Sequence, residues 1–503
     1  MPANLDLGYD YVVVGGGSAG AVLARRLSDD PAASVCLIEG GPAHEHDERV
    51  LLLRESLALV GNPAYDYDYA ITEQQRGNSL IRLSRARMLG GCSSHNDSWA
   101  LLAPDADMDR WAAAGATGWD AAGTAPHFDR VFAEMRVHRV AGGAALSLAW
   151  IEAAAERGIP LVDNTKGDFA DGISWVSLNE DAGVRVSTAV AYLYPLAELP
   201  PNLTVQLSTR ALRIPVENGR ATAIETDKGT VRARQEIIVC AGAIDTPRLL
   251  MLSGIGPADE LRKLGIEPVL DLPGVGANLQ DHVETPVTWE SARPAGASIN
   301  GLDLGLYARV LSDSTFDMQA TIGHFSYWLH AAPFDDLPRP EQAFTFAPNV
   351  ARPASRGSVR LASADPSDKP MVDPRYFTDS DNNDERVLVE GIRLARTLAE
   401  TSALRGWVVR EVSPGPAVTT DEALAAYARR YSNTVYHPSG TCRMGAEDDH
   451  RSVVGPRLKV RGLDGLRIAD ASIFPELVRV NPNMTVIMVG SKAADLIQQD
   501  AKA

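Results

Sequence analysis

The chain has 503 residues, of which 45% are hydrophobic and 22% charged, and these proportions are typical of a globular protein. A formal net charge of −17 argues against nucleic acid or an anionic membrane surface as a partner, and it is compatible with a neutral or cationic small substrate. The length exceeds what one simple hydrophobic core needs, so two consecutive or interleaved domains are expected.

The N-terminal residues and the cysteines indicate the cell compartment. The sequence Met-Pro-Ala-Asn-Leu-Asp lacks the basic and apolar regions of a signal peptide, and no apolar run reaches the length of a transmembrane helix. The four cysteines lie far apart and outside any C-x-x-C pattern, which argues against a zinc site and a disulfide framework. We therefore expect a cytoplasmic protein without a metal, nucleic-acid or membrane partner.

The first recognisable unit spans residues 9–39. An apolar run at 9–14 predicts a buried strand, and residues 15–20 (GGGSAG) follow it with the spacing G-x-G-x-x-G. Residues 21–27 show a helical apolar face, and a second apolar strand at 35–38 ends in Glu39. This order of strand, glycines, helix, strand and acid predicts a dinucleotide site, for either NAD or FAD.

Each position of the motif has a physical task. Gly15 allows a tight turn, Gly17 allows the backbone to approach a pyrophosphate, and Gly20 allows the helix to pack closely on the sheet. The N–H groups at the start of the helix, around Ser18 and Ala19, and the helix dipole bind the phosphate charge. Glu39 can accept both hydrogen bonds of a ribose diol.

A second glycine-rich loop occupies residues 87–97 (RMLGGCSSHND). Adjacent glycines followed by small hydroxyl residues suit a backbone that presses against a flat ligand, and His95 and Asn96 are placed to contact its reactive edge. Composition alone also allows a surface loop with an exposed histidine.

The middle of the chain mixes helices and strands. Residues 105–136 are expected to be helical with Trp111, Trp119 and Phe128 as core anchors, and 146–200 to be less ordered. Strands of an antiparallel piece are expected within 203–226, followed by a hairpin turn at 228–229. A buried strand is expected at 236–241, and a glycine-containing turn that leads into an apolar helix at 242–256.

The last part begins with another glycine-rich loop at 274–282. Residues 286–435 mix strands with helices such as 385–400 and are interpreted as a cap domain. A strand at 466–469 and a loop at 470–472 precede a final helix, which is expected to open at Asn481-Pro482-Asn483.

Four separated segments together resemble the glucose–methanol–choline (GMC) oxidoreductase family, over residues 9 to about 497. They are the dinucleotide motif, residues 87–97, residues 242–256 with the pattern Gly-x-x-x-Thr-Pro…Ser-Gly-Ile-Gly, and residues 433–445 (NTVYHPSGTCRMG) followed by Asn481. The resemblance implies a Rossmann-like FAD-binding domain (α/β) interleaved with a substrate domain built on an antiparallel sheet (α+β). The FAD domain is expected at 1–145, 203–285 and 440–503, and the substrate domain at 146–202 and 286–439.

The resemblance also implies the cofactor, FAD, and within the family the likeness is strongest to choline-oxidising members. In those members the histidine of the Cys-Ser-Ser-His-Asn run is bonded to the flavin, so His95 is a candidate for covalent attachment. The residues expected to bind FAD are Gly15, Gly17, Ser18, Ala19, Gly20, Glu39, Arg87, Gly90, Gly91, Ser94, His95, Asn96, Ala211, Ala241, Asp470, Ala471, Pro482, Met484 and Thr485.

His437 and Asn481 are the expected catalytic residues. Alcohol oxidation needs a base for the hydroxyl proton, and histidine suits this task because its ordinary pKa lies near neutrality. Asn481 would hydrogen-bond the same oxygen. As alternatives, His437 could satisfy a buried hydrogen bond, and Asn481 could cap the last helix, for which Asn483 is also a candidate.

The sequence departs from the choline-oxidising pattern at two positions. Asp97 stands where those members have serine, and Arg352 where they have a histidine of the catalytic site. No clear counterpart exists near 305–320 for the glutamate that holds their trimethylammonium group, and Asp313 and Asp317 are the nearest acids. The residues expected to contact substrate are Asp97, Arg352, Val435 and Tyr436.

The predicted reaction is FAD-dependent oxidation of a primary alcohol in an amino alcohol, polyol or aminosugar, with hydride transfer to the flavin and reoxidation by O2. Three alternatives stay open, which are a dehydrogenase with another electron acceptor, oxidation of choline itself, and a hydroxynitrile lyase. The recurrence of flavin motifs disfavours an NAD enzyme, and the pair of His437 and Asn481 disfavours a non-enzymatic flavoprotein. A homodimer is expected by analogy with relatives.

Overall fold

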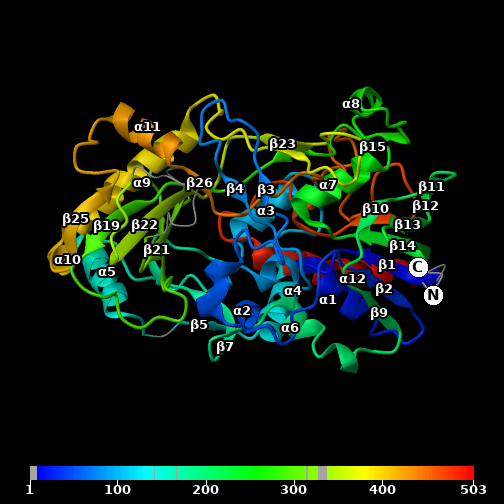
Figure 1. The fold of residues 1–503 in the computed structure, drawn as a ribbon, viewed down its shortest axis with the longest axis horizontal. Helices are drawn as coiled ribbons and strands as arrows, with labels where there is room; N and C mark the ends of the chain where they lie inside the picture. Colours follow the sequence, from blue (N-terminus) through cyan, green and yellow to red (C-terminus); the bar gives the residue numbers. More distant parts are fainter. Residues whose placement is uncertain (1–7, 141, 166, 313–314, 327–336, 503) are drawn as a thin grey trace.

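The computed structural model describes residues 8–140, 142–165, 167–312, 315–326 and 337–502. Two large β-sheets dominate the fold, and each is covered by its own helices (Figure 1). The sheet at the right of Figure 1 contains mainly parallel strands, and the sheet at the left is antiparallel. The predicted combination of a Rossmann-like part and an antiparallel part is confirmed.

The first sheet is built around strand β1. It pairs in parallel with β2 and β14, and these pair in parallel with β9 and β27, so the carboxyl ends of the five strands meet at one edge. The long strand β14 forms the predicted hairpin with β13, to which β10 adds. The strands are β1 (Gly8–Val14), β2 (Val35–Ile38), β9 (Leu203–Gln206), β10 (Ala211–Arg213), β13 (Ala223–Thr226), β14 (Gly229–Val239) and β27 (Leu466–Ile468).

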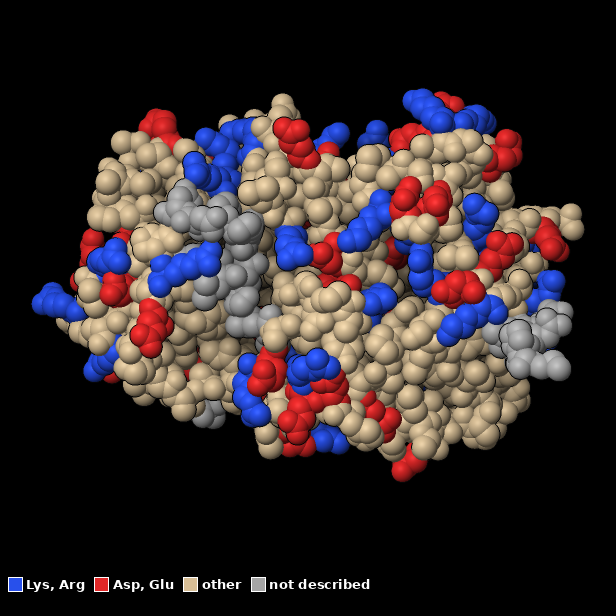
Figure 2. Space-filling model, in the orientation of Figure 1, with Lys and Arg blue, Asp and Glu red and all other residues tan. Residues whose placement is uncertain are grey.

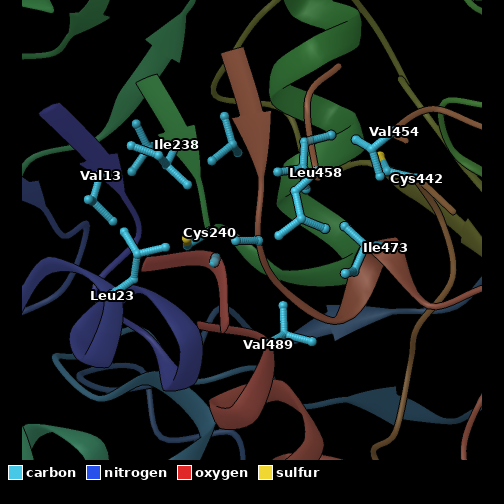
Figure 3. Packing of buried hydrophobic residues seen from close by; sticks show 14 of the residues in the cluster. Val13, Leu23, Ile238, Cys240, Cys442, Val454, Leu458, Ile473 and Val489 are labelled. Atoms are coloured by element: carbon cyan, nitrogen blue, oxygen red, sulfur yellow. The ribbon is translucent and has the colours of Figure 1, made fainter. Parts of the chain in front are cut away.

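Helices α1 (Ser18–Leu27) and α12 (Asn483–Asp500) pack against each other beside this sheet. Figure 3 shows the apolar packing, with Val13 of β1, Leu23 of α1 and Val489 of α12 in one cluster. The two helices approach closely because Gly490 faces α1, where a Cβ atom would lie 2.4 Å from the carbonyl oxygen of Ala19. This contact fixes the start of α1, where the predicted phosphate-binding turn lies.

The second sheet is antiparallel and carries helices α5, α9, α10 and α11. Its main path runs β25–β19–β22–β21–β20–β6, and the short strands β18 and β26 extend from β22. The elements are α5 (Ala145–Glu156), β6 (Gly172–Trp175), β18 (Val283–Glu284), β19 (Val287–Ser291), β20 (Leu304–Ala308), β21 (Met318–Gly323), β22 (Ala343–Val350), α9 (Asn383–Ala399), α10 (Ser402–Arg405), β25 (Val408–Ser413), α11 (Asp421–Arg430) and β26 (Asn433–Thr434).

The expectation of little order at 146–200 is wrong. Helix α5 and strand β6 belong to the second sheet, strand β7 (Ser177–Asp181) pairs with β5 (Val137–Arg139), and α6 (Thr188–Tyr192) packs on α1. Apart from α5, these elements are short, and their order depends on long-range partners, which local periodicity does not reveal. Strand β9, expected in an antiparallel piece, instead joins the parallel sheet beside β2. The domain boundaries themselves stay a prediction.

Helix α7 (Gly242–Leu252) begins at Gly242, where a turn was expected, and it therefore contains Pro247. Proline has no N–H for the carbonyl of the residue four positions before it, here Ala243. The hydroxyl of Thr441 donates to that carbonyl at 2.6 Å and replaces the missing bond. Asp470 caps the start of the helix by accepting from the N–H of Gly242 at 2.8 Å. Two residues from the C-terminal segment therefore allow a helix where the local sequence favours a turn.

The remaining predicted elements are found close to their expected positions. The region 105–136 holds two helices, and Trp111, Trp119 and Phe128 are buried as predicted. The other elements are α2 (Glu48–Leu51), β3 (Tyr69–Ala70), β4 (Arg82–Leu83), α3 (Asp105–Ala113), α4 (Ala121–Glu134), β8 (Val184–Arg185), β11 (Val216–Glu217), β12 (Arg220–Ala221), β15 (Ile255–Gly256), α8 (Ala258–Lys263), β16 (Leu270–Asp271), β17 (Ala277–Leu279), β23 (Gly357–Arg360) and β24 (Met371–Asp373).

The surface charges, the cysteines, the helix lengths and the potential metal ligands can be inspected directly in the structure. On the face shown in Figure 2, basic and acidic side chains are interspersed rather than segregated into a single patch. All four cysteines are free thiols. Among the described residues, no helix is long and apolar enough to cross a bilayer, and no group of three or more His, Cys, Asp or Glu side chains is arranged to hold a metal ion.

Candidate active site

One large pocket brings together residues from both sheets. It begins at the carboxyl end of β1, passes the start of α1 and the loop after residue 87, and reaches the segment after β26. The residues from the sequence predictions that line it are Gly15, Gly17, Ser18, Ala19, Glu39, Gly91, His95, Asn96, Asp97, Ala211, Ala241, Val435, Tyr436, His437, Asp470, Ala471, Asn481 and Pro482. Both predicted catalytic residues therefore share a cavity with the predicted dinucleotide motif.

Seven predicted residues do not line this pocket. Arg352 is half-exposed and pairs with Glu476 at 3.3 Å, so the sequence-based expectation of a cation in the pocket at this position is corrected. The guanidinium of Arg87 donates outward to the carbonyl of Pro63 at 2.7 Å, and Arg85 lines the pocket instead. The others lie behind the lining and support it, and they are Gly20, Gly90, Ser94, Met484 and Thr485.

The dinucleotide end fits the ADP half of FAD. No side chain caps the start of α1, so the first N–H groups of this helix are left for an anion in the pocket. The Glu39 carboxylate accepts from the N–H groups of Gly16 at 2.8 Å and Gly41 at 2.7 Å, which holds it beside the pocket with lone pairs to spare. Burial raises the pKa of Glu39 to about 7, although both backbone hydrogen bonds oppose the shift.

Asn483, a candidate cap of the last helix, does not cap it. Pro482 occupies the cap position, and the Asn483 amide donates to the hydroxyl of Ser18 at 2.9 Å. The side chain thus joins the starts of α12 and α1 across the pocket wall.

His95 lies at the far end of the 87–97 loop beside a buried carboxylate. Its Nε2 atom is 2.8 Å from the Ser84 hydroxyl and 3.7 Å from Asp66, and the Ser84 hydroxyl donates to Asp66. Burial opposes ionisation of Asp66, but hydrogen bonds from His95, Ser84 and backbone N–H groups hold its pKa well below the usual range. Asp66 and Ser84 therefore fix the orientation of the ring through its Nε2 atom and leave Nδ1 without a part in this contact.

His437 is paired with a second buried histidine, His282. The Nδ1 atoms of the two rings lie 2.8 Å apart, and Nε2 of His282 lies 3.1 Å from the carbonyl oxygen of Ala351. Because a carbonyl only accepts, His282 carries its proton on Nε2, and its Nδ1 accepts from Nδ1–H of His437. This chain leaves Nε2 of His437 as a free lone pair in the pocket, which is the tautomer that a base requires.

The segment that carries His437 is held by one buried acid, Asp281. Its carboxylate accepts from the N–H of His437 at 2.8 Å, and from the hydroxyls of Thr434 and Tyr376 at 2.6 Å each. Burial lowers the pKa of His282 to about 4. Burial also lowers the pKa of His437 well below its ordinary value, and the neighbouring His282 and Arg85 add to that shift. Both rings are therefore neutral near pH 7.

We expect these rings to make the protein acid-sensitive. An unfolded histidine binds a proton near pH 6.5 and folded His282 only near pH 4, so stability that is complete above pH 6.5 is lost as pH falls towards 4. For His282 the loss is about 3 kcal/mol, because a tenfold change in proton affinity corresponds to about 1.4 kcal/mol. The thermal midpoint of the FAD-loaded wild type should fall more steeply from pH 6.5 to 4.5 than that of His282→Gln. Parallel curves would contradict the neutral pair.

Asn481 is oriented by Gln319 of β21. The Gln319 amide Nε2 donates to Oδ1 of Asn481 at 2.9 Å. The Asn481 oxygen is thereby engaged, and its Nδ2–H₂ group remains as the donor for a substrate oxygen in the pocket. One donor, Asn481, and one base, His437, thus line the same cavity.

A Gln319→Leu variant should lose about tenfold in the rate of flavin reduction, because the Asn481 amide can then rotate and present its oxygen to the substrate oxygen. The measurement is anaerobic single-turnover reduction with a saturating alcohol. Gln319→Glu keeps the side-chain length but removes the donor, and it should behave like the leucine variant. Unchanged rates in both would show that Gln319 does not orient Asn481.

Glu284 is a buried acid that sequence reasoning missed. It is fully buried on β18, and neither carboxylate oxygen has a hydrogen-bond partner of good geometry within the described part of the chain, although the Asn433 side chain lies close enough to interact with the carboxyl group. Burial raises its pKa well above the ordinary value, the nearby Asn433 side chain opposes this shift, and Asp281 and Asp97 add to it. Of the two acids nearest to the expected position at 305–320, Asp317 accepts three backbone N–H groups of residues 310–312, and Asp313 lies outside the described residues.

The sequence signal that could have identified His282 and Glu284 is their spacing of two residues. His282 and Glu284 are two apart at the end of the 274–282 loop, and in an extended chain such residues point to the same side. Asp97 and Tyr436 line the pocket, and their contact with substrate stays a prediction. Arg185, on the segment expected to be less ordered, is buried and donates to Oδ1 of Asn96 at 3.1 Å and to Ser98 at 3.2 Å, so it shapes the loop around Asp97.

Comparison with known proteins gives the same assignment over almost the whole chain. Two sequence profiles described as GMC oxidoreductase match residues 9–284 and 353–490. Choline oxidase of Arthrobacter globiformis is 42% identical over 525 residues, covering 98% of this chain and 95% of that protein. Human mitochondrial choline dehydrogenase is 35% identical, covering 97% and 90%.

A solved structure supports the same fold. Pyridoxine 4-oxidase from Mesorbium loti superposes with a TM-score of 0.89 at 29% sequence identity, covering 98% of this chain and 99% of that one. The pocket described above offers a helix N-terminus, a buried acid and a glycine-lined wall that suit FAD. The chain belongs to the GMC oxidoreductase family and is an FAD-dependent oxidoreductase that acts on alcohols.

Proposed function

We propose that the chain oxidises the primary alcohol group of a small amino alcohol to the aldehyde. The observation that carries this proposal is the hydrogen-bond chain from Ala351 through His282 to His437, which leaves a basic nitrogen beside Asn481 in the pocket. Bound FAD supplies the acceptor for the hydride that leaves the carbinol carbon. The protein residues supply the base, the orientation and the charge.

His437 and Asn481 act on the substrate oxygen together. Nε2 of His437 takes the hydroxyl proton, and His282 holds the ring in the required tautomer by accepting from its Nδ1–H. Nδ2 of Asn481 donates to the oxygen as negative charge develops on it, and Gln319 keeps that donor in place. Fixing the oxygen at two points orients the carbinol carbon towards the cofactor.

The substrate charge follows from the acids near this end of the pocket. Glu284 has unpaired oxygens in a buried site, and an isolated buried carboxylate is costly unless a cation or donors accompany it. The names of the relatives, choline oxidase and choline dehydrogenase, refer to a cationic alcohol, which agrees with this charge. We therefore favour an amino alcohol over a neutral polyol, and an aminosugar fits the same chemistry.

We propose O2 as the electron acceptor, with hydrogen peroxide as its product. Val435, two residues before His437, lines the pocket and places an apolar side chain there. Among the relatives, one is named an oxidase and another a dehydrogenase, so their names do not decide the electron acceptor and an experiment is needed. Peroxide release should equal aldehyde formation in air-saturated buffer, and an absolute need for an added dye would show a dehydrogenase.

The homodimer and the cytoplasmic location stay predictions.

We further propose that His95 is bonded to the flavin. The Asp66–Ser84 pair supports this, because it orients the ring of His95 in the cofactor pocket. Acid-precipitated wild-type protein should retain the yellow flavin, and His95→Ala should release it into the supernatant. Asp66→Asn should lower the covalent fraction at least about twofold, since it removes the charge that holds the ring. Full release of flavin from the wild type would overturn the proposal.

A further inference from the structure

Four polar side chains form a row across four strands of the second sheet. Glu284 of β18 is paired with Asn433 of β26 on one side and with Asn349 of β22 on the other, and Asn349 is paired with Gln319 of β21. Residues that face each other in paired strands project from the same face of a sheet. All four are at most 4% exposed. We call these residues the polar row.

The polar row is rich in acceptors that lack donors. Among the described residues, both carboxylate oxygens of Glu284, Oδ1 of Asn349 and Oε1 of Gln319 have no hydrogen-bond partner. Buried polar atoms in folded proteins are nearly always paired, with protein, water or a ligand. Four unpaired acceptors side by side therefore point to a group that brings several donors to this place.

The polar row borders the reactive end of the pocket through Asn433, which is the member of the row that lines it, and Glu284, Asn349 and Gln319 lie behind that lining. Thr321, two residues after Gln319 on the same face of β21, lines the pocket, as do Asn433 itself and Val435 two residues later. Gln319 also donates to Asn481, one of the two residues that contact the substrate oxygen. A group bound at the row would thus belong to the same small molecule as the reacting hydroxyl.

We propose that the polar row binds the ammonium group of the substrate, and that this ammonium carries N–H bonds. The inference rests on the proposed function and specifies its substrate class as primary or secondary amines in their protonated form. A cation beside Glu284 opposes the raised pKa of its carboxyl group, so that Glu284 ionises on binding and provides the opposite charge. Asn349 and Gln319 accept hydrogen bonds in directions that a single carboxylate does not cover. A trimethylammonium group has no N–H, so it would leave all four oxygens unpaired. Neutral hydroxyl groups would donate but would not balance the buried carboxylate.

Binding of non-reactive amines to the FAD-loaded protein tests this separately from catalysis. Propylammonium and N,N,N-trimethylpropylammonium have the same chain but no hydroxyl, and their affinity can be followed by the flavin absorbance change or by the thermal midpoint. Propylammonium should bind at least about tenfold more tightly, because charge-assisted hydrogen bonds replace unpaired acceptors. Equal binding, or tighter binding of the trimethyl compound, would overturn the inference.

A pair of variants locates the preference. Asn349→Leu removes one acceptor of the polar row while keeping the volume, and it should reduce the preference for propylammonium by about fivefold. Thr345→Val removes a buried hydroxyl from the same strand outside the row and should leave the preference unchanged. If the preference for propylammonium fell equally in both variants, the cause would be a general loosening of the sheet. That result would contradict specific binding by the polar row.

Turnover separates this inference from the proposed function. The substrates are 3-aminopropan-1-ol and its N-methyl, N,N-dimethyl and N,N,N-trimethyl derivatives, with anaerobic flavin bleaching as readout. The inference predicts that kcat/KM falls along the series, with the largest step at the last methyl group. If every member bleaches the flavin and the trimethyl compound is best, the inference fails and the proposed function stands. If no alcohol bleaches the flavin, the proposed function fails, and the binding experiment still decides the inference.

Discussion

A His437→Gln variant should reduce the flavin about a thousandfold more slowly than the wild type, because a positioned general base contributes roughly two to four orders of magnitude. Glutamine can donate a hydrogen bond to the alcohol oxygen but does not take its proton. The measurement is the anaerobic rate of flavin bleaching at saturating amino alcohol, from pH 6 to 9. A loss of less than tenfold across this range would remove His437 from the role of base.

The His282→Gln variant is the control for this result. His282 contacts His437 and not the pocket, so its replacement frees the His437 ring to adopt either tautomer. We expect an intermediate loss, of about ten- to a hundredfold. FAD content and the retained yellow colour of precipitated protein should be unchanged in both variants, since His95 lies elsewhere in the pocket. Loss of FAD would instead indicate a structural defect.

A Glu284→Gln variant should lose about a hundredfold in kcat/KM for a cationic amino alcohol, while a neutral alcohol of equal length changes little. The reason is that the carboxylate is the buried group that balances the substrate charge, and leaving a buried cation without its partner is costly. The ratio of kcat/KM for 3-aminopropan-1-ol and butan-1-ol is the decisive quantity. The same loss for both alcohols would mean that Glu284 supports the fold and not the recognition of charge.

Asp317→Asn is the matched control for Glu284→Gln, because it also replaces one acid by its amide. Asp317 is one of the two acids nearest to the position expected for a partner of the substrate cation, but its carboxylate accepts from backbone N–H groups of residues 310–312. The variant should lower thermal stability and leave the ratio of the two alcohols at the wild-type value. A changed ratio would place Asp317 close to the substrate.

Local patterns were sufficient for the parts of the fold whose partners are near in sequence. Residues 9–39 form a strand, a glycine turn, a helix and a strand in continuous order, and the structure has them as expected. The hairpin between β13 and β14 is another case, since its turn and both strands are adjacent. In such units the apolar period and the glycine positions leave few alternatives.

Elements that depend on distant partners could not be predicted. The start of α7 depends on Asp470 and Thr441, which lie about two hundred residues away and compensate for Pro247. Order in the region 146–200 comes from a sheet and from helix α1, neither of which is visible in its own periodicity.

The candidate site shows the same division. The glycine motif, His95, His437 and Asn481 occur in distinctive sequence contexts, and the structure gathers them around one pocket. Glu284 and Gln319 have no distinctive context, and only the register of β18, β21 and β22 brings them together. Arg352 illustrates the reverse error, because equivalence by sequence position placed it in the pocket while its side chain pairs outside with Glu476.

The most direct test of the central claim is anaerobic mixing of the FAD-loaded protein with 3-aminopropan-1-ol. The account predicts that the flavin bleaches, that one aldehyde forms for each flavin reduced, and that deuterium on the carbinol carbon slows the bleaching severalfold. Absence of bleaching with this and every other alcohol of the series would contradict it, and so would aldehyde formation while the flavin stays oxidised.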